Sequence, residues 1–228
     1  MSSDRGPLGA ALLVLALGAC AASPAPSTAP RAAAAPGCEI PADGRMVNVQ
    51  AVDSTIRIDI RYATADNFTG RPLPGYERAA ALLRPEAARA LARVQARLRA
   101  DGLGLKVFDG YRPIRATQAM VNWATRSGNE WVLEQGYVAR QSGHNRGATV
   151  DLTVVRLATG EEVDMGTAYD TFSEAAHTAN ATGAVRDNRQ KLVAAMAAEG
   201  FANYDKEWWH FRLPGEHSAL DVPIACYL

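Results

Sequence analysis

A ten-residue segment, residues 142–151 (SGHNRGATVD), most constrains how this chain folds. His144 and Asp151 lie seven positions apart, and an odd spacing along one continuous strand would direct their side chains to opposite faces of a sheet. The Asn-Arg-Gly sequence at 145–147 predicts a turn between them. We therefore expect His144 on the segment that enters the turn, and Asp151 on the strand that leaves it, with its carboxylate pointing inward.

A second cluster, residues 207–210 (EWWH), places Glu207 three residues before His210. Two imidazoles and one carboxylate, from His144, His210 and Asp151, leave a fourth zinc position open for water, which is typical of catalytic rather than structural zinc sites. Iron or cobalt could occupy the same set of nitrogen and oxygen ligands. Glu207, which is not needed as a ligand, is the candidate to take the proton from that water. The two clusters together predict one catalytic metal ion per chain.

A third cluster, residues 109–113 (DGYRP), follows a short predicted strand. Arg112 precedes a proline, which favours an extended backbone and gives its guanidinium a defined direction. Aimed at the metal site, Arg112 could stabilise the oxyanion of a tetrahedral intermediate. Taken by itself, an arginine in such a turn is more often a surface salt-bridge partner.

The pattern of apolar residues predicts a mixture of helices and strands without regular alternation, which favours the α+β class over a doubly wound sheet. We expect a small mixed or antiparallel sheet with flanking helices. The predicted helices span residues 84–100, 114–125 and 187–199, and the predicted strands span residues 55–62, 105–108, 148–155 and 208–213.

The first residues of the chain predict export. Residues 8–19 form an apolar run of signal-peptide length, too short to span a bilayer, and it ends in Leu-Gly-Ala-Cys, which resembles the lipobox of bacterial lipoproteins. This predicts a signal peptide over residues 1–20 with a lipid on Cys20; the alternative is an ordinary signal peptide cleaved near residue 19 or 22. Residues 21–37 are rich in Ala and Pro and predict an extended tether. The predicted globular domain is 38–228, in the periplasm and anchored to a bacterial membrane.

Charge and cysteine content narrow the partners and the compartment. Lys+Arg and Asp+Glu number 24 each, so the formal net charge is zero, which argues against nucleic acid or an anionic membrane surface as the main partner. Cys38 and Cys226 stand at opposite ends of the predicted domain. In an oxidising compartment they could form a disulfide, and two free thiols are the alternative. The oligomeric state is left open.

These motifs together resemble those of the zinc D-alanyl-D-alanine dipeptidases, a family that includes the dipeptidases of vancomycin resistance and shares an α+β fold with the hedgehog signalling domain. The resemblance runs from about residue 47 to about residue 213. It rests on Ser142, His144, Gly147 and Asp151 in the pattern Ser-x-His-x-x-Gly-x-x-x-Asp, on Glu207 and His210 in Glu-x-x-His, on the intact segment 109–113, and on residues 61–70 (RYATADNFTG).

The resemblance implies roles for eight residues. His144, Asp151 and His210 would bind zinc, Glu207 would be the general acid and base, and Arg112 would stabilise the transition state. The pocket for the free amino terminus of the substrate would fall on Tyr62, Ser142 and Asp170.

The implied activity is zinc-dependent hydrolysis of D-Ala-D-Ala and related small D,D-dipeptides to free amino acids, in turnover or salvage of cell-wall peptides. A D,D- or L,D-carboxypeptidase acting on longer muropeptides is the nearest alternative, and a non-catalytic zinc-binding lipoprotein of the cell wall is another. The presence of Glu207 argues against the binding protein, which would not need it. Glycopeptide resistance does not follow from the resemblance, because the resistance enzymes lack the predicted signal and tether.

Overall fold

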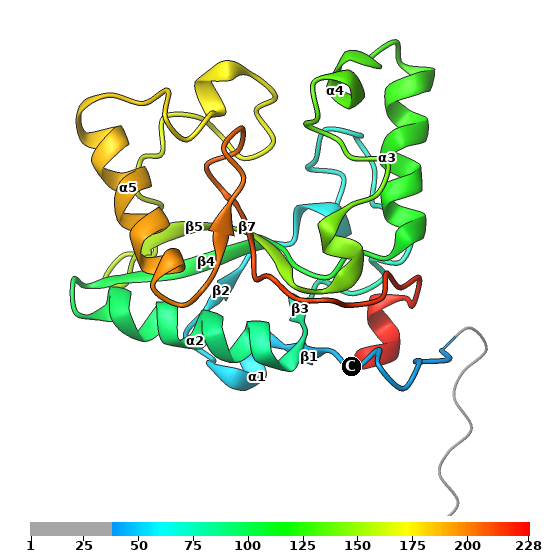
Figure 1. Ribbon diagram of the computed structural model, residues 1–228, viewed down its shortest axis with the longest axis horizontal. Coiled ribbons are helices and arrows are strands. Elements are labelled where there is room, and N and C mark those ends of the chain that lie inside the picture. Colours follow the sequence, from blue (N-terminus) through cyan, green and yellow to red (C-terminus); the bar gives the residue numbers. More distant parts are fainter. Residues whose placement is uncertain (1–37) are drawn as a thin grey trace, which may run out of the picture. The chain divides into compact units, whose positions relative to one another are not determined.

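The computed structural model describes residues 38–228, so the predicted signal peptide, lipobox and tether lie outside the described residues. The predicted α+β class is confirmed (Figure 1). A five-stranded sheet has the order β2-β4-β5-β7-β6, in which β2 runs parallel to β4 and the other neighbours are antiparallel. Its strands are β2 (Arg57–Ile58), β4 (Leu103–Asp109), β5 (Thr149–Arg156), β6 (Ala202–Asn203) and β7 (His210–Arg212). A separate antiparallel pair joins β1 (Val47–Asn48) to β3 (Leu82–Leu83).

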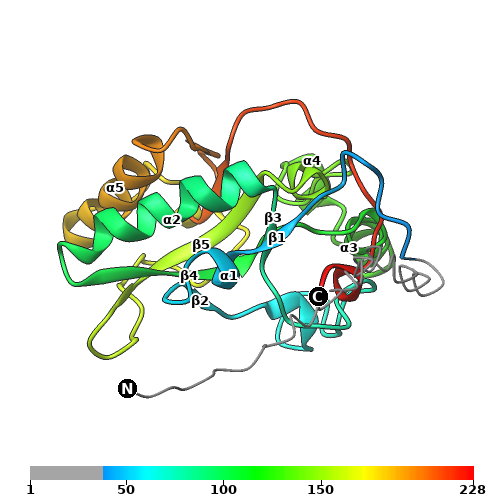
Figure 2. The same ribbon diagram turned by 90° about the horizontal axis from the view of Figure 1, so that it is seen from below.

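The helices lie around the larger sheet. They are α1 (Val49–Val52), α2 (Pro85–Arg99), α3 (Ile114–Arg126), α4 (Trp131–Glu134) and α5 (Gly183–Ala197). Figure 2 shows α2 lying across the sheet, and its buried residues include Leu91, Val94 and Leu98, which share one face as the sequence spacing predicts. Pro85 occupies the first turn of α2, where its missing N–H costs no hydrogen bond. In Figure 1, α5 stands at one end of the larger sheet, and α3 and α4 stand at the other.

Two predicted elements differ from the structure. The predicted strand 55–62 is wrong in extent, because only Arg57 and Ile58 pair with β4, and Arg61–Ala63 form a 3-10 turn (η1). That turn buries Tyr62 to 2% exposure, so core packing of the aromatic ring overrides the alternating pattern. Helix α5 begins at Gly183, four residues before the predicted start. The other predicted helices and strands are confirmed, with end residues shifted by a few positions.

The two ends of the described chain are joined covalently. Cys38 and Cys226 form the disulfide that the sequence allowed, across 188 residues. Before Cys226, an extended segment donates a hydrogen bond from the Leu220 N–H to the Asn145 carbonyl, and the Tyr111 hydroxyl bonds to the backbone of Val222. Within residues 38–228, no helix combines the length and apolar character needed to cross a bilayer.

Candidate active site

Strand register brings the predicted residues of two clusters side by side. Asp151 on β5 is the direct cross-strand partner of His210 on β7, and on its other side it pairs with Asp109 of β4. A row of three functional side chains therefore runs across the sheet where these strands meet. Because β5 is the central strand of the three, Asp151 is buried, with an exposed fraction of 3%.

The predicted turn before β5 is a 3-10 turn, η2 (Gly143–Arg146), and it carries His144. Gly147 ends it with a φ of 75°, a conformation that favours glycine. Gly143 is required for another reason: a Cβ there would lie 2.7 Å from the Thr149 hydroxyl oxygen. The turn is therefore packed closely against the start of β5, and the imidazole of His144 reaches back over that strand.

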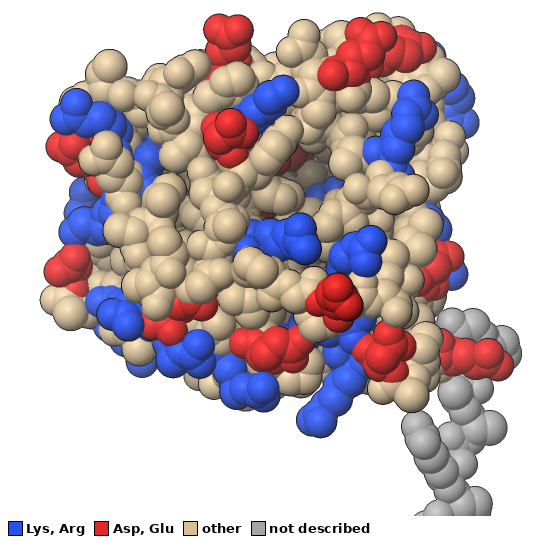
Figure 3. Space-filling view, viewed as in Figure 1, with Lys and Arg blue, Asp and Glu red and all other residues tan. Residues whose placement is uncertain are grey.

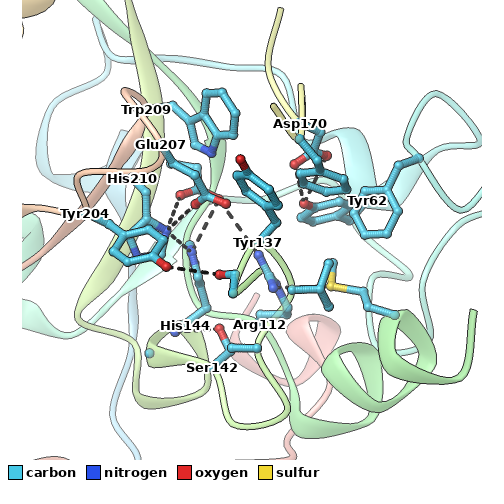
Figure 4. A pocket seen from close by; sticks show the side chains of 18 residues that line it. Tyr62, Arg112, Tyr137, Ser142, His144, Asp170, Tyr204, Glu207, Trp209 and His210 are labelled. Carbon is cyan, nitrogen blue, oxygen red and sulfur yellow. Dashed lines mark hydrogen bonds and ion pairs between the residues drawn. The ribbon is translucent and has the colours of Figure 1, made fainter. Parts of the chain in front are cut away.

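The ligand atoms of the three predicted ligands all lie within 4.8 Å of one another. Figure 4 shows the His144 and His210 rings directed toward each other. His144 Nε2 lies 3.3 Å from Asp151 Oδ2 and 3.4 Å from His210 Nδ1, and His210 Nδ1 lies 3.0 Å from Asp151 Oδ1. Asp151 Oδ1 is nonetheless a buried oxygen without a hydrogen-bond partner among the described residues. Buried polar atoms are almost always satisfied, so two imidazole nitrogens and an orphaned carboxylate oxygen at this spacing fit a metal ion.

Contacts at the Nδ1 atom fix the orientation of the His144 ring. Its Nδ1 atom lies 2.7 Å from the carbonyl oxygen of Gly110, which can only accept, so Nδ1 carries the proton and Nε2 offers its lone pair to the site. Asp109 Oδ2 lies 3.3 Å from the same Nδ1. Such a second partner orients a ligating imidazole.

Glu207 stands beside this cluster. Its Oε2 lies 3.5 Å from His210 Nδ1, and the residue is 6% exposed. Burial raises the pKa of the Glu207 carboxyl well above its usual range, and the charges of Asp151 and Asp170 add to the increase while Arg112 opposes it. A carboxylate with a raised pKa is a stronger base, as proton abstraction from water requires.

Arg112 is buried and directed inward, so the alternative of a surface salt-bridge partner is wrong. Its guanidinium donates to Asp109 Oδ2 from Nε at 2.9 Å, and it lies 5.0 Å from the centre of the Tyr62 ring. Arg112 Nη2 is 3.8 Å from Asp151 Oδ2. Asp109 thus holds both Arg112 and His144 and accepts a short hydrogen bond from the Tyr76 hydroxyl. No role was predicted for Asp109; its place three residues before Arg112 is the signal that could have found it.

Tyr62 and Asp170, 108 residues apart in sequence, also meet in this site. The Tyr62 hydroxyl lies 3.1 Å from both carboxylate oxygens of Asp170. Burial, followed by the charge of Asp151, raises the pKa of Asp170 to about 8, while Arg112 and the Tyr62 hydrogen bond oppose this. The Tyr169 hydroxyl lies 2.9 Å from that of Tyr62 and 3.0 Å from Asp151 Oδ2, so it links the Tyr62–Asp170 pair to the metal cluster. Sequence reasoning missed Tyr169, although it directly precedes Asp170.

Ser142 has a structural partner in the η2 turn. Its hydroxyl accepts from the backbone N–H of His144 at 3.2 Å, and the Asn145 side chain accepts from the Ser142 N–H. The two residues form a capping box that fixes the turn. Ser142 also lines the cavity of the site, which is compatible with the predicted contact to substrate.

All eight predicted residues line one cavity of about 380 Å³. Figure 3 shows the molecule hollowed near the centre of this face, with acidic and basic side chains inside. The remaining wall is largely aromatic or apolar and was not predicted; it includes Phe68, Met120, Tyr137, Phe172, Tyr204 and Trp209. Tyr137 is held from behind by His177, with its hydroxyl 3.0 Å from His177 Nε2. The metal cluster and the Tyr62–Asp170 pair are therefore open to the same small molecule.

This chain is similar in sequence to known proteins of one family. The family profile described as D-ala-D-ala dipeptidase matches residues 43–228. A D-alanyl-D-alanine dipeptidase of Streptomyces coelicolor is 39% identical over 200 residues, covering 80% of this chain and 99% of the relative. One of Enterococcus faecalis is 40% identical over 176 residues, covering 71% and 87%. The solved structure of the LdcB LD-carboxypeptidase is 18% identical, covers 85% of this chain and 74% of its own, and superposes with a TM-score of 0.44.

Proposed function

The chain belongs to the D-alanyl-D-alanine dipeptidase family of zinc metallopeptidases, and from that premise we propose how its site hydrolyses D-Ala-D-Ala to two molecules of D-alanine. The single observation that carries the choice of a free dipeptide is the Tyr62–Asp170 pair. It stands in the same cavity as the metal cluster, and so offers a carboxylate to a substrate ammonium group next to the bond that is cleaved.

The proposed ligands of one zinc ion are His144 Nε2, His210 Nδ1 and an Asp151 oxygen. Zinc held there supplies a Lewis acid that polarises the peptide carbonyl and makes water more acidic. The chain's own contribution is a prearranged set of donor atoms, because Gly110 and Asp109 fix the His144 ring and the β5–β7 register fixes Asp151 against His210.

Glu207 moves the proton. Its carboxylate takes one proton from the attacking water as the oxygen bonds to the peptide carbon. The same proton then passes to the nitrogen of the leaving D-alanine when the C–N bond breaks, so Glu207 ends the cycle ionised. Its position beside His210, with little exposure to solvent, suits a group that must shuttle a proton without losing it to bulk water.

Arg112 binds the oxygen that becomes negative. The guanidinium is buried, held by Asp109 and kept near Asp151, so it adds a fixed positive charge where the carbonyl oxygen develops negative charge. An arginine already paired with a buried carboxylate needs little reorganisation during the reaction, which is the condition for effective electrostatic stabilisation.

The Tyr62–Asp170 pair selects substrate length. Asp170 would accept the ammonium group of the first residue, and Tyr62 would orient that carboxylate. A peptide extended at its amino terminus brings a neutral amide to a buried carboxylate, which costs the charge pairing. This favours dipeptides over the longer muropeptides of a carboxypeptidase.

The test is release of D-alanine from D-Ala-D-Ala, N-acetyl-D-Ala-D-Ala and a cell-wall pentapeptide by the purified protein, before and after chelation and restoration of zinc. Zinc-dependent release from the free dipeptide, with much slower cleavage of the other two, is expected. Equal rates on all three would favour the carboxypeptidase. Tight binding of cell-wall peptides without hydrolysis would favour the non-catalytic lipoprotein.

We also propose that the enzyme is exported and anchored through a lipid on Cys20. Support comes from the apolar run at residues 8–19, the Leu-Gly-Ala-Cys sequence, and the Cys38–Cys226 disulfide, since stable disulfides are typical of oxidising compartments. Incorporation of labelled fatty acid into the expressed protein, and its loss in Cys20→Ser, is the expected result. A protein released free of lipid with its first residue at or after position 20 would contradict the anchor.

A further inference from the structure

Asp170 lies in a loop whose two ends are joined by one buried side chain. We call these ends, Met165 on one side and Ala175 with His177 on the other, the neck of the loop. We propose that Arg189 of α5 is the positioning residue for the substrate's amino-terminal pocket, acting through the backbone of residues 165–177; this rests on the proposed dipeptidase function. Arg189 is 1% exposed. It lies outside the cavity of the active site, so any effect on the substrate must pass through that loop.

The guanidinium of Arg189 binds both sides of the neck. Its Nε and Nη2 donate to the Met165 carbonyl at 2.9 and 2.6 Å, and Nη2 also donates to the Ala175 carbonyl at 2.9 Å. Nη1 donates to the His177 carbonyl at 2.8 Å. Asp170 lies midway along the chain between Met165 and Ala175. One rigid, planar group therefore closes a loop whose tip is the amine-binding carboxylate.

The chemistry of this contact is unusual for a buried arginine. Every hydrogen bond recorded for its side chain within residues 38–228 goes to a backbone carbonyl, and no carboxylate pairs with it at salt-bridge distance there. A buried charge is tolerated where its donors are paired, and here three loop carbonyls accept the hydrogen bonds from Nε, Nη1 and Nη2. If the loop changed conformation, the buried guanidinium would lose its hydrogen-bond partners, so its burial favours the observed conformation of the loop.

The tip of the loop needs such support. Asp170 has a φ of 59°, the one positive value among the described residues other than glycine. A non-glycine residue in that region costs about 1 kcal/mol or more unless the surroundings impose it. The segment has little regular structure of its own apart from the 3-10 turn Glu174–Ala176. Trp208 also contacts this segment, from its indole N–H to the Thr167 hydroxyl at 2.8 Å and from its backbone N–H to the Ala176 carbonyl at 3.1 Å.

The expected consequence is a selective loss of substrate binding. Arg189→Met keeps an unbranched apolar stem and removes all donors, so the neck opens and Asp170 loses its fixed position opposite Tyr62. Because the amine contact is made equally in the ground state and the transition state, its loss raises KM and leaves kcat nearly unchanged. We expect KM for D-Ala-D-Ala to rise about 10- to 100-fold. Arg189→Lys, with three donors on a flexible stem, should give a smaller increase.

The experiment measures kcat, KM, zinc content and thermal unfolding for the wild type, both Arg189 variants and Arg186→Met. Arg186 lies on the same helix, is exposed and pairs with neighbouring Asp187, so its variant should match the wild type. A variant that merely folds less well would lose apparent kcat and keep its KM. That result, or an unchanged KM in Arg189→Met, would overturn the proposal. If Arg189→Met fails to fold, Arg189→Lys must show the rise in KM.

Amide hydrogen exchange tests the role of Arg189 independently of the proposed dipeptidase activity. In Arg189→Met, amides of residues 165–177 should exchange faster while those of β5 stay protected. If the wild type does not hydrolyse D-Ala-D-Ala, the proposed function fails, and exchange still decides whether Arg189 closes the neck. Unchanged exchange in the loop would refute the positioning role whatever the activity.

Discussion

The two halves of this site are built in different ways. The metal half takes Asp151 and His210 from paired strands in direct register, and His144 from a turn clamped onto the same strand. The amine half, which we propose binds the substrate's amino terminus, takes Tyr62 from a 3-10 turn and Asp170 from the tip of a loop. Strand register fixes Asp151 against His210, and contacts with Gly110 and Asp109 orient His144. The second half depends on side chains, including Tyr169 between the two halves and Arg189 behind the loop.

This difference assigns different parts of the chemistry to the two halves. Bond breaking needs atoms placed within a fraction of an ångström, which a central strand provides. Substrate selection needs one carboxylate that can be placed by a loop, and loops can change without disturbing the sheet. We therefore expect changes in the metal half to reduce kcat and changes in the amine half to raise KM.

The largest expected effect comes from the metal half, with Glu207→Gln. The amide keeps the size of the side chain and cannot accept the proton from water, so kcat should fall about 10²- to 10⁴-fold with KM and zinc content little changed. The measurement is steady-state D-alanine release with metal analysis of the same samples. Glu216→Gln, an exposed neighbour in the segment after β7, is the matched control and should keep wild-type activity. A Glu207→Gln enzyme with normal kcat would remove Glu207 from the mechanism.

A smaller effect, of a different kind, is expected from Asp170→Asn. The amide cannot pair with an ammonium group, and a charge-assisted hydrogen bond contributes about 1.5–3 kcal/mol, so KM should rise roughly 10- to 100-fold at nearly constant kcat. Initial rates over a wide range of D-Ala-D-Ala concentration give both constants. If kcat fell instead while KM stayed constant, the proposed division between the two halves would be wrong.

The same substitution should stabilise the metal-free protein at alkaline pH. Burial raises the pKa of Asp170 to about 8 in the folded protein, above its value in the unfolded chain. The folded state therefore binds the proton of Asp170 more tightly, and this contribution to the unfolding free energy is fully present below about pH 4. That contribution declines as pH rises and is lost once pH passes about 8. Asp170→Asn removes this titration. Denaturant unfolding of chelated wild type and variant from pH 5 to 9 should show a difference in unfolding free energy that grows in favour of the variant. A constant difference across that range would contradict the raised pKa.

The sequence predicted the metal half far better than the amine half. His144, Asp151, Glu207 and His210 stand in short motifs, and the turn at 145–147 with its glycine already implied how His144 returns over the strand. The Tyr62–Asp170 pair spans 108 residues and came only from the resemblance to a family. The 3-10 turn at Tyr62, the neck closed by Arg189 and the aromatic wall depend on tertiary packing, which overrides local pattern and leaves no periodic signal.

The smallest effect on activity is expected from removing the disulfide, and it should reach only the metal half. The segment that Cys226 anchors contacts Asn145, next to His144, and Tyr111, next to Arg112. Replacing Cys38 and Cys226 together with serine should lower unfolding free energy by about 2–4 kcal/mol, because the bridge constrains the unfolded chain. In the folded enzyme KM should stay unchanged and kcat should fall slightly. Thermal unfolding and steady-state kinetics of the double variant check both. A rise in KM at constant kcat would show that the disulfide supports the amine half instead. It would contradict the proposed division of roles between the two halves.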